Sequence, residues 1–101
     1  MAKKDEVAEL IVERATDFKM ALSNKRKYPA VEFEVFATAV RQYADLIRND
    51  RLIHKKVVQE VHGLRDYLRL ERKRIPDGVL AEADRLECLV FAGYDQYFDG
   101  A

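Results

Sequence analysis

Hydrophobic positions between residues 36 and 68 recur every three or four residues without a break in phase. Ten positions share this register: Phe36, Val40, Tyr43, Ile47, Asp50, His54, Val57, Val61, Leu64 and Leu68. Apolar residues at this spacing form the buried face of an amphipathic helix that packs against other helices. Only Asp50 and His54 are polar, and they are adjacent in the series. The chain therefore either continues as one long helix or turns at Asn49-Asp50 and begins a new one.

We favour the turn, because Asn49 and Asp50 are both of the residue types that cap helices. An uninterrupted helix would reach about 45 residues, far beyond the ~8 to 20 of ordinary globular helices. In this interpretation Asp50 caps the third helix.

Apolar stripes and turn residues predict four helices, near residues 4–22, 30–48, 51–74 and 78–92. Pro29 suits the first turn of the second helix, whose apolar face should include Val31. The segment Ile75-Pro76-Asp77-Gly78 predicts a turn in which Asp77 caps the fourth helix. The predicted core comprises Ile11, Phe18, Phe36, Val40, Ile47, Val57, Val61, Leu64, Leu86 and Val90.

No run of alternating apolar and polar residues predicts a strand. With 101 residues, 49% of them hydrophobic and 36% charged, the chain has the composition of one globular domain rather than of a disordered segment. We therefore expect an all-α, antiparallel bundle of three to four helices in a single domain over residues 1–93, followed by a tail over residues 94–101.

Charge is balanced overall but segregated along the chain. Residues 41–74 contain ten basic and five acidic side chains, whereas residues 75–101 contain one and six. The acidic fourth helix and tail are expected to lie against the basic third helix, within one molecule or across a subunit interface. An external anionic partner is the alternative.

The single cysteine, Cys88, cannot form a disulfide within the chain and is expected in or near the core of a protein in a reducing compartment. No apolar run approaches the ~20 residues that cross a bilayer, and the start of the chain does not resemble a signal peptide. We expect a cytoplasmic protein. There is no zinc-ligand spacing or glycine-rich phosphate loop, and we expect neither a metal nor a cofactor.

The segment Arg48-Asn49-Asp50-Arg51-Leu52-Ile53-His54 resembles the RNA-cleaving motif of the HEPN superfamily, an Arg followed by a polar residue and then a His. Members of that superfamily are small helical bundles, often dimeric, whose paired motifs meet in a cleft. The resemblance implies that His54 acts as an acid or base and that Arg48 stabilises the phosphate. The alternative, which we favour, is that His54 is a structural residue of the packing face, hydrogen-bonded to Asp50.

Three segments are candidates for binding. Two are basic, Lys25-Arg26-Lys27 and Arg72-Lys73-Arg74, and the third is the tail with its aromatic residues Tyr94, Tyr97 and Phe98. The basic clusters could contact phosphates, whereas the tail could fold back on the bundle or anchor on another protein. We expect a small, non-enzymatic interaction or adaptor module that is homodimeric and has a protein partner. A nucleic-acid-directed protein, from a phosphate-backbone binder to a HEPN-like RNase, is the alternative.

Overall fold

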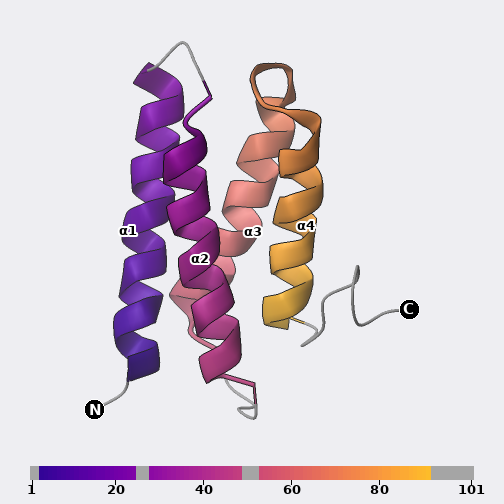
Figure 1. The fold of residues 1–101 in the computed structure, drawn as a ribbon. Coiled ribbons are helices and arrows are strands. Elements are labelled where there is room, and N and C mark those ends of the chain that lie inside the picture. Colours follow the sequence, from indigo (N-terminus) through magenta and orange to yellow (C-terminus); the bar gives the residue numbers. More distant parts are fainter. Residues whose placement is uncertain (1–2, 25–27, 49–52, 92–101) are drawn as a thin grey trace.

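A computed structural model describes residues 3–24, 28–48 and 53–91, except for the side chains of Arg74 and Asp77. Its elements are α1 (Lys3–Asn24), α2 (Ala30–Leu46), α3 (Lys55–Leu70), a single 3₁₀ turn η1 (Arg72–Arg74) and α4 (Asp77–Phe91). No strand occurs within these residues, and the four helices form one bundle (Figure 1). The predicted all-α fold is confirmed.

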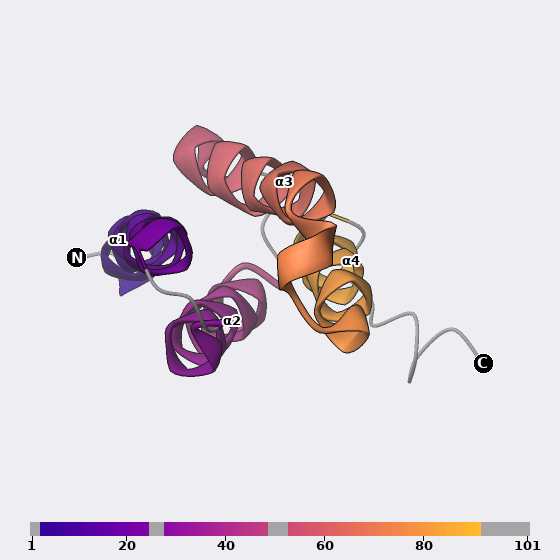
Figure 2. The ribbon, with the colours of Figure 1, turned by 90° about the horizontal axis from the view of Figure 1, so that it is seen from above.

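The four helices are arranged as two antiparallel hairpins, α1–α2 and α3–α4, laid side by side. Between the hairpins, α1 packs on α3 and α2 packs on α4, so the helices follow one another around the bundle in the order α1, α2, α4, α3 (Figure 2). Neighbours along the chain run antiparallel, whereas the two pairs that join the hairpins run parallel (Figure 1). The connection from α2 to α3 therefore crosses from one hairpin to the other.

The core lies between the two hairpins and contains all ten residues that the sequence predicts as buried. The predicted seam extends on both sides of the α2–α3 connection, since Phe36, Val40, Tyr43 and Ile47 are buried before it and Val57, Val61, Leu64 and Leu68 after it. The placement of Val31 in this face is wrong. Val31 is 72% exposed and lies on the outer surface of α2.

The predicted break between the second and third helices is confirmed. Helix α2 ends at Leu46 and α3 begins at Lys55, with His54 in extended conformation as the N-cap residue. The predicted cap, Asp50, is therefore wrong, and the helix begins four residues later than expected. Asn49 and Asp50 themselves lie outside the described residues.

The other boundaries differ from the predictions by smaller amounts. Helix α3 ends at Leu70, and its predicted last residues form the separate turn η1, after which Ile75 is extended. Pro29 is the N-cap of α2 instead of a first-turn residue, and its carbonyl accepts a hydrogen bond from the Phe33 N–H at 3.1 Å. Asp77 is the first residue of α4 and not its cap.

Candidate functional site

The motif residue His54 joins three helices at one end of the bundle. Its Nδ1 lies 2.7 Å from the hydroxyl of Tyr43 on α2, and its Nε2 lies 2.5 Å from the carboxylate of Asp5 in the first turn of α1. The backbone N–H of His54 donates a second hydrogen bond to the same Tyr43 oxygen at 2.8 Å. The carbonyl of His54 accepts the first hydrogen bonds of α3, from Val57 and Val58.

These contacts determine which nitrogen of a neutral His54 ring carries the hydrogen. A neutral imidazole that donates its Nε2–H to the Asp5 carboxylate must accept at Nδ1, so the Tyr43 hydroxyl donates there. Both ring nitrogens of His54 are then hydrogen-bonded, and Tyr43 is fully buried. His54 thus faces other helices, with Tyr43 and Asp5 as its described partners, whereas the predicted partner Asp50 lies outside the described residues.

The other motif residue, Arg48, follows the end of α2 and has a 74% exposed side chain. It pairs with Asp45 three residues earlier, with Nη2 and Oδ1 2.6 Å apart. Within the described residues, Arg48 and His54 therefore have separate sets of partners.

Two acidic side chains of α4, Asp84 and Glu87, contact α3, in the direction that the charge segregation predicts. Arg65 lies at the centre of this contact, 2.5 Å from Asp84 and 3.2 Å from Glu87. The hydrogen bond to Asp84 is the main cause that raises the pKa of Arg65 above its usual value. His62 also reaches Glu87, at 2.8 Å. Opposite charges of α3 and α4 are therefore paired at Arg65 within one molecule.

The predicted binding segments are only partly within the described structure. Arg72 and Lys73 are exposed in η1, and the neighbouring Arg69 is exposed on the last turn of α3. The backbone of Arg74 belongs to the same turn, but its side chain is not described. The remaining predicted residues lie outside the described residues: Lys25, Arg26, Lys27, Tyr94, Tyr97 and Phe98.

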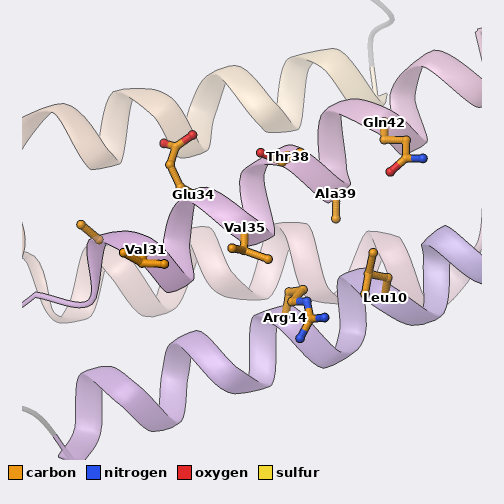
Figure 3. A pocket seen from close by; sticks show the side chains of 9 residues that line it. Leu10, Arg14, Val31, Glu34, Val35, Thr38, Ala39 and Gln42 are labelled. Atoms are coloured by element: carbon orange, nitrogen blue, oxygen red, sulfur yellow. The ribbon is translucent and has the colours of Figure 1, made fainter.

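A groove between α1 and α2 is the surface feature that the sequence interpretation missed. This α1/α2 groove has a volume of about 500 Å³ and is open to solvent. Its lining residues come from α1 (Leu10, Arg14) and α2 (Ala30, Val31, Glu34, Val35, Thr38, Ala39, Gln42). In Figure 3 the valines of α2 lie along one side of the groove, and Leu10 and Arg14 lie on the other.

The interior of the α1/α2 groove is apolar and accessible. Val31 and Val35, one turn apart on α2, are 72% and 42% exposed. The exposed side chain of Thr38 continues this surface along α2, and Ala39, which is buried, also lines the groove. A contiguous apolar surface of this kind is typical of a site that another molecule covers.

Two charged side chains border the groove. Arg14 pairs through Nη1 with Asp17 at 3.0 Å, and its buried Nε has no hydrogen-bond partner among the described residues. Glu34 is exposed and lies 3.8 Å from Arg41, a weak contact. The groove therefore offers one donor and one acceptor beside its apolar surface.

Tyr28 stands just before α2, with its ring packed edge-on against Phe18 at a centroid distance of 6.0 Å. Its buried hydroxyl has no hydrogen-bond partner within the described part of the chain. Burial, and secondly the negative charge of Glu34, raise the pKa of Tyr28 above its usual value. The hydroxyl therefore favours its neutral form in the folded protein.

The sequence does contain a signal for the groove. Val31, Val35, Thr38, Gln42 and Leu46 follow one another at spacings of four, three, four and four residues. This second stripe lies on a different face of α2 from the seam. Because two of its five members are polar, the spacing of apolar residues alone does not reveal it.

Within residues 3–24, 28–48 and 53–91, no group of three or more His, Cys, Asp or Glu residues is arranged to hold a metal ion. None of the described helices has the length and apolar character needed to cross a bilayer. Comparisons with protein-family models, with curated proteins and with solved structures found no match.

Proposed function

We propose that this protein is a small, non-enzymatic interaction module that docks a helix of a protein partner in the α1/α2 groove. The observation that carries the proposal is the pair of exposed valines, Val31 and Val35, in a groove beside Leu10. Partner helices commonly place an apolar face in such a groove, and the buried apolar contacts then supply most of the affinity.

The dimensions of the groove suit a helix. Its lining residues extend along α2 from Ala30 to Gln42, which corresponds to about 18 Å at a rise of about 1.5 Å per residue. This length matches about three turns of a docked helix. Arg14 and Glu34 at the border could fix its orientation through polar contacts.

The state of His54 supports a role without catalysis. An acid or base must reach the proton that it transfers, whereas both ring nitrogens of His54 already bond to Asp5 and Tyr43. The His54 ring is positioned to hold α1, α2 and the start of α3 together.

The proposal is tested by introducing charge into the groove. Val31→Glu and Val35→Glu should each abolish capture of partner proteins from a cell lysate by the tagged protein. Leu70→Glu is the matched control, because Leu70 is 85% exposed on α3 and does not line the groove. Circular dichroism should show that all three variants stay folded, since each site is solvent-exposed. Identical capture by wild type, groove variants and control would contradict the proposal.

We also propose that the protein acts as a homodimer in the cytoplasm. The support for this location is the single cysteine, Cys88, which is half-buried and lies in a chain that has no second cysteine to pair with.

A second candidate function is binding of a nucleic-acid backbone at the end of the bundle that carries η1. Along the sides of the bundle, cations such as Arg41 and Arg65 are paired with acidic residues of α4. By contrast, Arg69, Arg72 and Lys73 are exposed and have no ion pair to another described residue. If these cations bind phosphates, the affinity for RNA or DNA should fall steeply as salt is raised, and Arg72→Gln should reduce the slope. Salt-independent or absent binding would exclude this candidate.

A further inference from the structure

The exposed stripe of α2 has an arrangement that is complementary to itself. We infer that the molecule docked on this face is a second copy of the same chain, with α2 packed antiparallel against its own copy across a two-fold axis near Thr38. This inference rests on the proposed function, since it names the occupant of the α1/α2 groove and the form of the homodimer.

Apolar residues at the two ends of the stripe support the antiparallel pairing. Val31 and Val35 lie at its beginning, and Leu46, which is 38% exposed, lies at its end. When α2 pairs with its copy about Thr38, Val31 of one protomer falls within about one residue of Leu46 in the other. The contact occurs twice because the interface is symmetric. A parallel pairing would instead leave Leu46 facing its own copy, without the two valines.

Small residues lie where the two helices would cross. Thr38 occupies the middle of the stripe, and the neighbouring Ala39, which is buried, also lines the groove. Small side chains at a crossing point let two helix backbones approach closely. Bulky or charged residues at this position would hold the helices apart.

Charged residues on one flank of the stripe also favour the antiparallel arrangement. Glu34 and Arg41 both lie on the side of the stripe that faces α4, where Arg41 contacts Glu82. Both side chains keep substantial exposure, 68% for Glu34 and 43% for Arg41. An antiparallel copy places Arg41 of one protomer beside Glu34 of the other, so opposite charges meet on this flank. On the α1 side, Arg14 is already paired with Asp17 and adds little net charge.

Sedimentation equilibrium of the full chain tests the inference over about 1 to 300 µM, a range that detects micromolar dissociation constants. Wild type should sediment as a dimer of the 11.7 kDa chain at the upper concentrations. Val35→Glu should raise the dissociation constant about tenfold or more, whereas the control Leu70→Glu should leave it unchanged. Val31→Glu serves as the second groove variant, because its site is more exposed and less able to disturb folding.

Cross-linking tests the position of the two-fold axis. In a Cys88→Ala background, Thr38→Cys should form a disulfide-linked dimer on mild oxidation, because each Cys would face its own copy. Met20→Cys is the control, since Met20 is exposed on α1 outside the groove and should stay monomeric on a reducing-agent-free gel.

A monomeric wild type at all concentrations would overturn the inference, as would a dimer that both groove variants leave intact. Equal cross-linking by Thr38→Cys and Met20→Cys would overturn the antiparallel arrangement. A monomeric wild type that still captures a lysate protein through the groove would overturn this inference alone, whereas a monomer whose capture does not depend on the groove would contradict the proposed function as well.

Discussion

Replacing Tyr43 with phenylalanine removes one hydroxyl from the point where α1, α2 and α3 meet. The ring stays in place, because phenylalanine fills almost the same volume in this fully buried position. Two hydrogen bonds to His54 are lost, one to Nδ1 at 2.7 Å and one from the backbone N–H at 2.8 Å. The substitution therefore isolates the polar contribution of this junction from its packing.

The expected loss of stability follows from those two bonds. Each intramolecular hydrogen bond contributes about 0.5–1.5 kcal/mol net, and a part-buried donor that loses its acceptor adds a desolvation cost. We expect Tyr43→Phe to lower the free energy of unfolding by about 2 kcal/mol. For a domain of this size that corresponds to a fall in Tm of roughly 8–16 °C.

Urea denaturation followed by circular dichroism at neutral pH measures this change, and the slope of the transition should stay constant. Tyr67→Phe is the matched control, because among the described residues the Tyr67 hydroxyl makes a single exposed contact, 3.4 Å from the Ser23 hydroxyl. Its expected effect is below about 0.5 kcal/mol. A double-mutant cycle of Tyr43→Phe with His54→Ala should give a coupling energy of about 1 kcal/mol. Equal effects of the two Tyr→Phe variants would refute the reasoning.

Three further changes have defined outcomes. Leu64→Ala should lower the free energy of unfolding by about 2–5 kcal/mol in urea, because Leu64 is buried, whereas Leu70→Ala should change it by less than about 0.5 kcal/mol. Stability should fall as pH rises above about 10, since unfolded Tyr28 loses its proton there while the folded hydroxyl keeps it. Tyr28→Phe should reduce this slope in urea midpoints measured on either side of that pH. Finally, wild type and His54→Ala should both leave RNA intact, and only the variant should be less stable; metal-independent cleavage that His54→Ala abolishes would contradict the structural role.

The helices and the core could be predicted from the sequence because both depend on local periodicity. Every predicted core residue is buried, and the break between the second and third helices occurs despite the unbroken phase of the seam. The capping residue could not be predicted in the same way. His54 takes the N-cap position because Tyr43 and Asp5 bind its ring and its backbone N–H, and these partners are 11 and 49 residues away in the chain.

The groove illustrates the same limit. The sequence places Val31 on the apolar face of the second helix, yet Val31 is exposed on the outer surface. A valine on a helix is buried only if another element covers that face, and the sequence does not state which helices are neighbours. The ring order, in which α2 contacts α1 and α4, decides that this face stays open.

The ring order also has a consequence for how the chain folds. Contacts within each hairpin join residues close in sequence, such as Phe18 with Phe33 or Arg65 with Asp84. Contacts of α1 with α3 and of α2 with α4 join residues far apart in sequence, as in the ion pairs of Lys19 with Glu60 and Arg41 with Glu82. Because local contacts form first and distant ones cost more chain entropy, each hairpin should condense early and the two should dock in the slower step. Mutations at the contacts of α1 with α3 and of α2 with α4 should then change mainly the unfolding rate, whereas mutations between α1 and α2 should slow folding.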